Sequence, residues 1–571
     1  MPLAKPWCQP AFAPCASAGQ APGVALRRGT LEARLGASPS AARLEKVIGP
    51  ELLLRAHERL ARYASLIITL LLIYVAAVSV IKAMHRPFWF DEIFTVTIAR
   101  MPSMHDVWRA LTTSADANPP GFYVAERFLA SLVDNERLGF RLASIVTVPF
   151  ACLSLFLFMR RDTDAVAGSI AAVFPLLTVL YSTFSIEARP YGLMACFLAI
   201  AALAWQRASR PAWSFGLALS LIAAISVHYY ALFALIPFAA AEAARIVSER
   251  RVRLNVWLAF GAAAVSILMY WPMLVNLRRL YGGRYYWSTA TIFRAIASYD
   301  EYMSLIPVGA MLGVIALLSG ALLLYLVRAA IRGEDDPVQP GFAPANCVLA
   351  LGLLWMPWIA LGIAKMTDGG LAARYAIGTT LGLAMSASYV SFWLGQRMSA
   401  VMLILLLTAF GSKEAVYWGA EWYGLNPTRV DVASFERLLE SAQDPTLPIV
   451  VTNGMEFVPL TYYVSPPMSQ RLVALIDREA AREHLGSDSI EVDLLVLQEC
   501  LPITVQTYDA FETQHQRFLL YASPGHGDWW QERLLRDGLG LTTIAADGSR
   551  VLYRVERKNP PAANRFGAAG S

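Results

Sequence analysis

The sequence predicts a polytopic α-helical membrane protein of about eleven transmembrane helices, followed by a C-terminal soluble α/β domain. Composition is the first indication: of the 571 residues, 56% are hydrophobic and only 16% are charged. A soluble domain of this length carries about 25% charged residues. Long apolar stretches recur up to about residue 420, and beyond that point the apolar runs shorten to the length of strands.

The apolar stretches predict the individual spans, because a helix that crosses the hydrocarbon core needs about 20 mainly apolar residues. Only His228 and its neighbours separate two short stretches in the middle of the series. The predicted spans are 64–84, 139–159, 165–183, 190–206, 213–227, 230–247, 255–275, 305–328, 347–365, 376–395 and 399–418.

The N-terminal segment, 1–62, differs from the rest of the chain. Residues 1–50 are rich in Ala, Pro, Gly and Ser, a composition that cannot bury a core and that predicts disorder. They lack an apolar stretch followed by a cleavage site, so we predict no signal peptide. The pattern of 51–62 is amphipathic and rich in Arg, which predicts a surface helix that leads into a transmembrane domain at 63–419.

The C-terminal domain, 420–571, predicts strands that alternate with helices and a largely parallel sheet. It ends in a flexible tail from about residue 558. Without a glycine-rich phosphate fingerprint, it is interpreted as a binding or docking module. Strands are expected at Ile449–Val451, Leu472–Ile476, Leu494–Leu497 and Phe518–Tyr521, and helices at 431–443, 503–515 and 528–537.

The positions of Lys and Arg predict a cytoplasmic N-terminus. An odd number of spans then places the C-terminal domain outside, together with the loops 85–138 and 276–304. The second of these loops holds four Arg against the charge trend, which requires a long solvated loop or an anionic partner. The cations assigned to inside loops are Arg160, Arg161, Arg207, Arg210, Arg250, Arg251, Arg253, Arg328, Arg332 and Arg397.

Charge and cysteine content limit the class of partner. The net charge of +5 is modest and the Arg residues lie in loops, so nothing indicates nucleic-acid binding. No CxxC or Cys/His spacing appears, which argues against a disulfide framework or a zinc site. The six cysteines are Cys8, Cys15, Cys152, Cys196, Cys347 and Cys500.

Two adjacent acids, Asp91 and Glu92, follow Phe88-Trp89-Phe90 just after the first predicted span. Acids close to apolar surface are costly unless they stay wet, are paired or have a function. The simplest interpretation is a pair of solvated acids, with Asp91 capping a helix that begins near Glu92. The alternative, which we favour, is a general base at a cleft near the membrane.

Two further motifs accompany the acid pair. The segment Asp116–Tyr123 carries Asn118, the turn-forming sequence Pro-Pro-Gly and Tyr123 in the same exterior loop. The segment Ser185–Tyr191 opens the fourth span and contains Glu187, Arg189 and Tyr191. Glu187 and Arg189 are spaced either to form a structural ion pair or to face a cleft.

In order and sidedness, these three motifs resemble the GT-C membrane glycosyltransferases. More narrowly they resemble the bacterial branch grouped with protein O-mannosyltransferases and the lipid A aminoarabinose transferase. The resemblance covers about residues 64–420. It implies a GT-C-like fold and an inverting transfer of a monosaccharide from a polyprenyl-phosphate carrier to a lipid, glycan or protein acceptor. The reaction is expected on the periplasmic face of a bacterial inner membrane, with an undecaprenyl carrier.

The resemblance also implies roles for individual residues. Asp91 matches the acid that is the proposed catalytic base of the family. Glu92 is expected to orient Asp91 or to contact the sugar, and Asp116 matches a less uniform position.

The departing polyprenyl phosphate requires cations, and Arg suits phosphate because its planar fork can form two bonds at once. Arg374 and Tyr375 open the tenth span as an R-Y pair. Arg374 either binds the phosphate or only extends its charged end to the membrane interface. At an outside turn, His228 and Tyr229 are expected either to contact sugar or phosphate or to belong to the aromatic belt. Further candidates for the phosphate are Lys365, Arg278, Arg279 and Arg284.

Two questions stay open at this level. Asp91, Glu92, Asp116 and Asp368 are hard oxygen ligands that suit a divalent cation such as Mg, Mn or Ca, but nothing decides metal dependence. A transporter or flippase for lipid-linked sugars and a non-catalytic membrane scaffold are alternative functions. The flippase predicts polar residues near the bilayer midplane and paired repeats, and the sequence has few ionisable residues inside spans and no obvious repeat.

Overall fold

The computed structural model describes residues 50–281, 285–303, 307–332, 341–423, 431–442, 444–523, 527 and 529–557. The chain divides into two units, Met1–Leu53 and Leu54–Ser571. The contacts and the cavity discussed below belong to the second unit. Residues 1–49, predicted to be disordered, and the tail from 558 lie outside the described residues.

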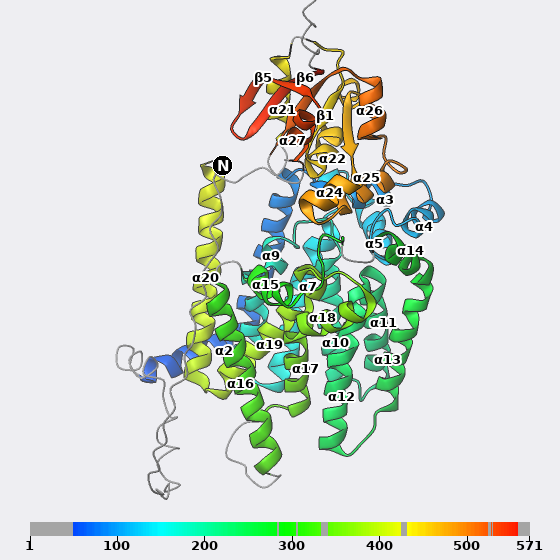
Figure 1. Cartoon of the computed structure of the whole chain (residues 1–571). Helices are drawn as coiled ribbons and strands as arrows, with labels where there is room; N and C mark the ends of the chain where they lie inside the picture. The colour runs from blue at the N-terminus through cyan, green and yellow to red at the C-terminus, as the bar shows by residue number, and fades with distance from the viewer. Residues whose placement is uncertain are drawn as a thin grey trace, which may run out of the picture. The chain divides into compact units, whose positions relative to one another are not determined.

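Helices make up the chain as far as Trp422 (Figure 1). The first group runs to the middle of the helical region: α2 (Pro50–His85), α3 (Phe90–Ala99), α4 (Met104–Thr112), α5 (Pro120–Ala130), α6 (Glu136–Gly139), α7 (Leu142–Asp162), α8 (Ala165–Val173), η1 (Phe174–Leu177), α9 (Val179–Ser182), α10 (Tyr191–Gln206), α11 (Pro211–Val227), η2 (Tyr229–Ala234) and α12 (Leu235–Glu249). The second group is α13 (Leu254–Ser266), η3 (Ile267–Tyr270), α14 (Trp271–Tyr281), α15 (Ile292–Tyr302), α16 (Val308–Arg332), α17 (Pro344–Leu354), α18 (Met356–Thr367), η4 (Ala373–Ala376), α19 (Gly378–Trp393) and α20 (Gln396–Trp422).

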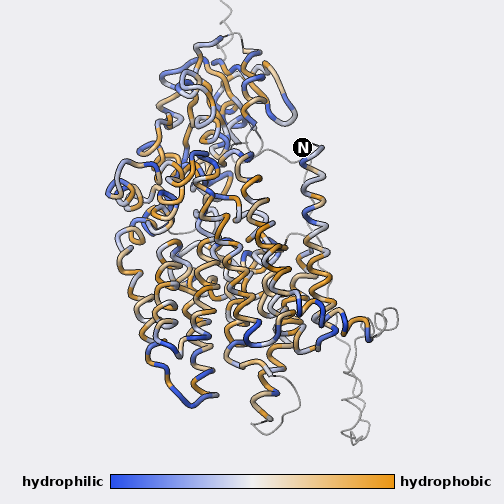
Figure 2. Tube along the Cα trace, turned by 180° about the vertical axis from the view of Figure 1, so that it is seen from behind, coloured by the Kyte–Doolittle hydropathy of each residue, from blue (hydrophilic) through white to orange (hydrophobic). Residues whose placement is uncertain are grey.

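The helices confirm a polytopic membrane protein. Among the described residues, six helices are long and apolar enough to cross a membrane, and α17 with α18 forms a seventh candidate bent by 58°. The other four predicted spans, 165–183, 190–206, 213–227 and 376–395, fall on α8 with η1, α10, α11 and α19, which are shorter. Each of the eleven apolar stretches therefore contains helix. Figure 2 shows the long helices dominated by hydrophobic residues, with hydrophilic residues at their connecting ends.

Two features interrupt this regular pattern. The helix α2 is continuous from Pro50 to His85, so the predicted surface helix and the first span form one element. The bend between α17 and α18 lies at Trp355, and Pro357 in the first turn of α18 has no N–H to continue the helical ladder.

The C-terminal part contains a six-stranded sheet with the order β3-β2-β1-β4-β6-β5. The strands β3, β2, β1 and β4 pair in parallel, whereas β4, β6 and β5 pair antiparallel, so the sheet is mixed. The strands are β1 (Ile449–Val451), β2 (Leu472–Ile476), β3 (Thr504–Thr507), β4 (Arg517–Ala522), β5 (Leu539–Asp547) and β6 (Arg550–Arg557). The helices are α21 (Val432–Glu440), α22 (Gly454–Tyr463), α23 (Pro466–Ser469), α24 (Arg478–Leu485), α25 (Ser489–Leu497), α26 (Tyr508–Gln514) and α27 (Trp529–Arg536).

Helices cover both faces of the sheet, as buried parallel strands require. Val450 and Val473 point toward the face that packs on α24, α26 and α27. Ile449 and Leu472 point toward the opposite face, where α21, α22 and α25 join the same apolar core as the membrane helices. This second face brings α25 toward the transmembrane part of the chain.

Three strands of the sheet match the prediction, and one expected strand was wrong. Leu494–Leu497 belongs to the helix α25 because Ile490, Leu494 and Leu497 form one apolar helical face. The expected helix 503–515 is β3 followed by α26, and β5 and β6 were missed. The two missed strands are antiparallel and partly exposed, and neither alternates regularly between polar and apolar residues, so the period-2 signal of a strand is absent.

A close helix contact at Gly382 predicts the effect of a packing substitution. A Cβ atom at Gly382 in α19 would lie 2.2 Å from the backbone nitrogen of Leu354 at the end of α17. We expect Gly382→Val to separate these helices and to destabilise the protein by about 1–3 kcal/mol, as overpacking does. The midpoint of thermal unfolding in detergent measures this. Gly411→Val is the matched control, because nothing lies within 4 Å of the added Cβ atom, and an unchanged midpoint for Gly382→Val would refute the close contact.

Candidate functional site

A cavity of about 1080 Å³ lies where the first loop, the membrane helices and the C-terminal domain meet. One part of its wall is charged, with Asp91, Asp116, Arg189 and Arg374. Another part is apolar, and its residues come from the membrane helices and their ends: Leu232, Phe233, Ile267, Trp271, Leu274, Val275, Leu277 and Ile363. The cavity therefore joins an ionic end to a hydrophobic wall.

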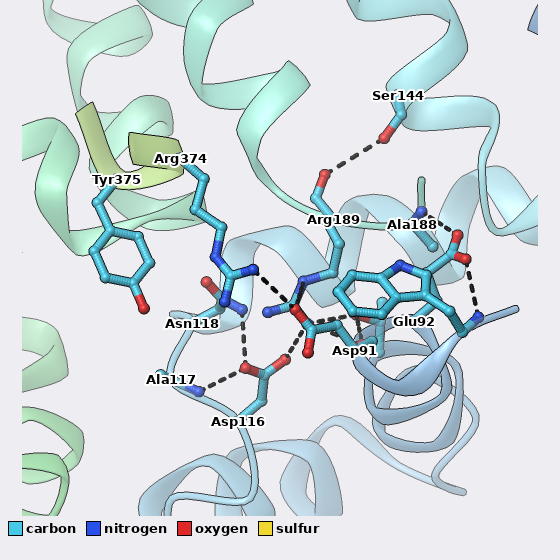
Figure 3. A network of polar contacts seen from close by, with 12 residues as sticks. Asp91, Glu92, Asp116, Ala117, Asn118, Ser144, Ala188, Arg189, Arg374 and Tyr375 are labelled. Carbon is cyan, nitrogen blue, oxygen red and sulfur yellow. Dashed lines mark hydrogen bonds and ion pairs between the residues drawn. The ribbon is translucent and has the colours of Figure 1, made fainter. Parts of the chain in front are cut away.

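Asp91 lies in the first turn of α3 and faces this cavity with a side chain that is 17% exposed. Trp89, and not Asp91, occupies the N-cap position of the helix, so the capping role considered for Asp91 was wrong. Two guanidinium groups face the carboxylate (Figure 3): its Oδ2 lies 3.5 Å from Arg374 Nη1 and 3.9 Å from Arg189 Nε. Both distances are longer than a hydrogen bond, so the carboxylate is attracted to these cations without being saturated by them.

Asp116, in contrast, is fully hydrogen-bonded within the protein. Its Oδ1 accepts from the backbone N–H of Ala117 at 2.6 Å and from Asn118 Nδ2 at 3.0 Å. Its Oδ2 accepts from Tyr123 Oη at 2.7 Å and from Arg189 Nη1 at 2.9 Å. Four donors on two oxygens leave Asp116 suited to hold Arg189 in place.

Arg189 connects the three sequence motifs. Besides Asp116, its Nη1 donates to the backbone oxygen of Asp91 at 3.0 Å and to Thr95 Oγ1 at 3.3 Å. The structure therefore brings the acid pair, the Asp116 loop and the Ser185–Tyr191 segment together around one buried guanidinium. Among the described residues, Arg189 forms ion pairs with Asp91 and Asp116. Glu187, two residues earlier in the chain, is also buried.

Glu92 points away from the cavity into the core, although it is adjacent to Asp91. Its oxygens accept two hydrogen bonds of 2.7 Å from Arg141 and one of 2.7 Å from the backbone N–H of Ala188. Both side chains of the Glu92–Arg141 pair are 1% exposed. Successive helical residues lie about 100° apart around the axis, so only one acid of the pair can face the cavity. The expected contact of Glu92 with a sugar has no geometric support, and a positioning role remains.

Arg141 ties this region together. Beyond Glu92, it donates to the backbone oxygens of Ala83 and Arg86 at 2.7 Å and of Pro87 at 3.1 Å. The pair therefore fixes the end of α2, the start of α3 and the segment that carries Arg189.

An aromatic group surrounds Arg374 and Tyr375. Tyr375 Oη lies 2.8 Å from Tyr286 Oη, and the guanidinium of Arg374 lies 5.0 Å from the ring centre of Trp287. The rings of Tyr191 and His228 complete the group at 5.5 Å from each other. Burial, and then the charges of Arg189 and Arg374, lowers the pKa of His228 to about 3, so this imidazole is neutral. Tyr229 also lines the cavity.

The other predicted cations are less closely associated with the cavity. Arg278 lines it and forms an exposed ion pair with Asp368 at 3.6 Å. Lys365 and Arg279 are exposed, and neither belongs to the cavity wall in the described part of the chain. Arg284 lies outside the described residues.

The predicted metal ligands do not gather into one cluster. Within the described ranges, no three His, Cys, Asp or Glu side chains are arranged to hold a metal ion. Glu92 is bound to Arg141, Asp116 is held by four donors, and Asp368 is paired with Arg278.

Two acids that the sequence did not single out lie in this region. Asp493 on α25 lines the cavity, and its Oδ1 accepts a hydrogen bond of 2.7 Å from Tyr281 Oη. Glu126 on α5 is completely buried, and both of its oxygens lack a hydrogen-bond partner among the described residues. Burial, and then the charge of Glu92, raises the pKa of Glu126 well above its usual range. In the sequence, the only indication of a special role for Glu126 or Asp493 was an acid within an otherwise apolar helical segment.

These features define a multi-pass membrane protein with a C-terminal mixed α/β domain and a charged cavity. No protein-family model matches the chain, and no curated protein sequence matches it either.

The chain is structurally similar to ArnT from Cupriavidus metallidurans bound to undecaprenyl phosphate, with 14% sequence identity and a TM-score of 0.40; the match covers 86% of this chain and 97% of ArnT. The apo state of ArnT matches with 13% identity and a TM-score of 0.39, over 85% of this chain and 97% of ArnT. The matched protein is of the kind that the three motifs resemble.

The buried Glu92–Arg141 pair predicts a large loss of stability when one partner is removed. Arg141→Ala leaves the Glu92 carboxylate buried without its cation, and such a loss costs about 3–5 kcal/mol. The midpoint of thermal unfolding in detergent is expected to fall accordingly. The control is Arg100→Ala, because the Arg100–Glu136 pair is solvent-exposed and exposed pairs contribute about 0–1 kcal/mol. Equal midpoints for the two variants would contradict the structural role.

The raised pKa of Glu126 predicts a stability that depends on pH. A carboxyl whose pKa is higher in the folded than in the unfolded state stabilises the fold below the unfolded pKa, and this contribution is lost as the pH rises toward the folded pKa. Glu126→Gln cannot ionise, so the thermal midpoint of this variant should rise relative to that of the wild type as the pH increases from 5 to 8. The exposed substitution Asp134→Asn is the control. A constant difference between Glu126→Gln and wild type across this range would show that Glu126 is not protonated in the fold.

Proposed function

We propose that this protein is an inverting glycosyltransferase that takes a monosaccharide from a polyprenyl-phosphate carrier. The observation that supports this most is the cavity itself, in which guanidinium groups and a carboxylate lie beside an apolar wall built from membrane helices. A polyprenyl phosphate has the same two properties, an anionic head and a long hydrocarbon tail. The acceptor is a lipid, a glycan or a protein.

The donor phosphate would bind at Arg374. This guanidinium is held among aromatic rings and is 26% exposed toward the cavity, so it stays accessible to a ligand. Negative charge develops on the phosphate as the sugar leaves, and preorganised cations in a dry site stabilise such charge strongly. Arg189 and Arg278, which also line the cavity, add to the positive potential. Tyr375 would orient the phosphate beside Arg374.

Asp91 would act as the general base. The acceptor oxygen forms a bond to the anomeric carbon, and the bond from that carbon to the phosphate oxygen breaks with its electron pair on the phosphate. The proton of the acceptor hydroxyl passes to Asp91. Because attack and departure occur on opposite faces of the carbon, the anomeric configuration inverts.

Donor binding would also prepare the base. In the free protein Arg374 lies 3.5 Å from Asp91. A phosphate at Arg374 competes for the same guanidinium and so leaves the Asp91 carboxylate free to accept a hydrogen bond from the acceptor hydroxyl.

We place this reaction at the periplasmic face of a bacterial inner membrane, with the N-terminus in the cytoplasm. The support is that Arg residues gather in alternate short loops, and such Arg-rich loops lie in the cytoplasm in membrane proteins. With that orientation, the acid pair and the C-terminal domain share the outer side.

Binding of undecaprenyl phosphate tests the donor half of the site. Arg374→Ala should weaken binding to the full-length protein in nanodiscs roughly 10- to 100-fold, the usual value of a hydrogen bond to a charged group. Arg109→Ala, which removes an exposed cation on α4, should leave the affinity within twofold. An affinity of Arg374→Ala equal to that of wild type would refute the phosphate site.

The chemical half is tested in cells that lack the gene and produce either the wild type or Asp91→Asn. Mass spectrometry of envelope glycolipids, glycans and glycoproteins should show a wild-type product that falls at least 100-fold with Asp91→Asn, as expected for a general base. The exposed variant Asp134→Asn should restore the product. A flippase or a scaffold would instead keep its product with Asp91→Asn.

A further inference from the structure

The C-terminal domain supplies part of the cavity wall through α25 and the residues before it. Ser487, Ser489, Ile490 and Asp493 all line the cavity. Ile490 and Asp493 are three residues apart on α25 and so share one helical face, which lines the cavity, while Leu494 packs into the shared apolar core. The site therefore contains a carboxylate from a segment about 400 residues away from Asp91 in sequence.

Two hydrogen bonds fix α25 to the membrane part of the chain. Tyr281 Oη donates to Asp493 Oδ1 at 2.7 Å, and the backbone N–H of Trp287 donates to Ser489 Oγ at 3.1 Å. Within the described ranges, Tyr281 Oη is the hydrogen-bond partner of Asp493 Oδ1, and the Asp493 side chain lines the cavity.

The charges around Asp493 favour a particular class of ligand. Burial raises its pKa to about 7 against the opposing hydrogen bond from Tyr281, and the carboxylates of Asp91, Asp116 and Glu491 add to the rise. An ionised carboxylate at position 493 repels an anionic group and favours a neutral one that donates hydrogen bonds. The remaining charged or titratable groups of the cavity wall are Arg189, Arg278, Arg374, Asp368, His228, Tyr191, Tyr229, Tyr230, Tyr286 and Tyr375.

The groups beside Asp493 suit a sugar. Tyr286 and Trp287 contact Tyr375 and Arg374, and the backbone of Trp287 also bonds to Ser489, so these two rings connect the Arg374 group to α25. Aromatic faces bury the apolar C–H surface of a sugar ring, and hydroxyls such as those of Ser487 and Ser489 donate and accept hydrogen bonds. A carboxylate accepts two hydroxyl donors. The cations Arg189 and Arg374 lie beside Asp91, where the donor phosphate is proposed to bind.

We propose that Asp493 binds the acceptor and that this acceptor is a carbohydrate, so that the C-terminal domain forms the acceptor half of the site. Ionised Asp493 accepts a hydrogen bond from an acceptor hydroxyl and holds the sugar across the cavity from the donor. A second hydroxyl of the same sugar then faces Asp91 and the anomeric carbon. This inference rests on the proposed transferase function and adds the class of acceptor to it.

The test uses the full-length protein and three substitutions. Asp493→Asn keeps an oxygen that can accept from Tyr281 but cannot ionise. Tyr281→Phe removes the hydrogen bond that lowers the pKa of Asp493 and keeps the carboxyl. Asp509→Asn changes an exposed acid in the same domain and is the matched control. Membranes from producing cells contain donor and acceptor together, so the transfer product is measured there by mass spectrometry between pH 5.5 and pH 8.5.

We expect wild-type transfer to fall on acidification with a half-point near pH 7, because only the ionised carboxylate accepts the hydroxyl. Asp493→Asn should lower transfer roughly 10- to 100-fold, and the remaining transfer should no longer decrease on acidification. The affinity of this variant for undecaprenyl phosphate should stay within twofold of wild type. Tyr281→Phe should move the half-point to higher pH. The product should carry the new sugar on a sugar hydroxyl.

Several outcomes would overturn the inference. A product on a protein side chain, an amine or a phosphate refutes the carbohydrate acceptor. Full transfer by Asp493→Asn, or a loss of undecaprenyl-phosphate affinity as large as that of Arg374→Ala, refutes the acceptor role. If Asp493→Asn does not fold, an unmoved half-point for Tyr281→Phe refutes it. A wild-type protein with neither transfer nor undecaprenyl-phosphate binding refutes the transferase itself.

Discussion

The buried ion pair between Glu92 and Arg141 is the interaction on which the arrangement of the cavity depends. A bidentate contact at 2.7 Å, with both side chains 1% exposed, joins α3 to the start of α7. Further hydrogen bonds from the same two side chains hold the end of α2 and the backbone at Ala188. Because α3 and the Arg189 segment are both fixed by this pair, Asp91 and Arg189 reach the cavity in a defined relation.

The acids of the cavity differ in how they are paired with donors and cations. Asp116 accepts hydrogen bonds from four donors and holds Arg189 in place. Asp91 is attracted by two cations at distances longer than hydrogen bonds and keeps an open face. A burial of this many ionised groups is costly unless each is paired. Pairing within the protein explains how the first loop tolerates acids at the edge of an apolar core.

The two ends of the cavity differ because different parts of the chain build them. Helices of the membrane part contribute the apolar wall and the guanidinium of Arg374, whereas α25 contributes serine hydroxyls and a carboxyl. The apolar core is continuous between α25 and the membrane helices, and this packing holds α25 at the cavity wall. One acid of the C-terminal domain, Asp493, therefore lines the same cavity as Asp91.

The sequence by itself determined the positions of the apolar stretches, the change of character near residue 420 and the three loop motifs, because hydropathy and local composition carry these signals. It also predicted three of the six strands. Only the tertiary structure decided which acid of the Asp91–Glu92 pair faces the cavity, since the rotation of α3 depends on how Arg141 packs. Likewise, only folding brings Asp493 into the same cavity as Asp91, because the proximity of segments so distant in the chain leaves no local pattern in either of them.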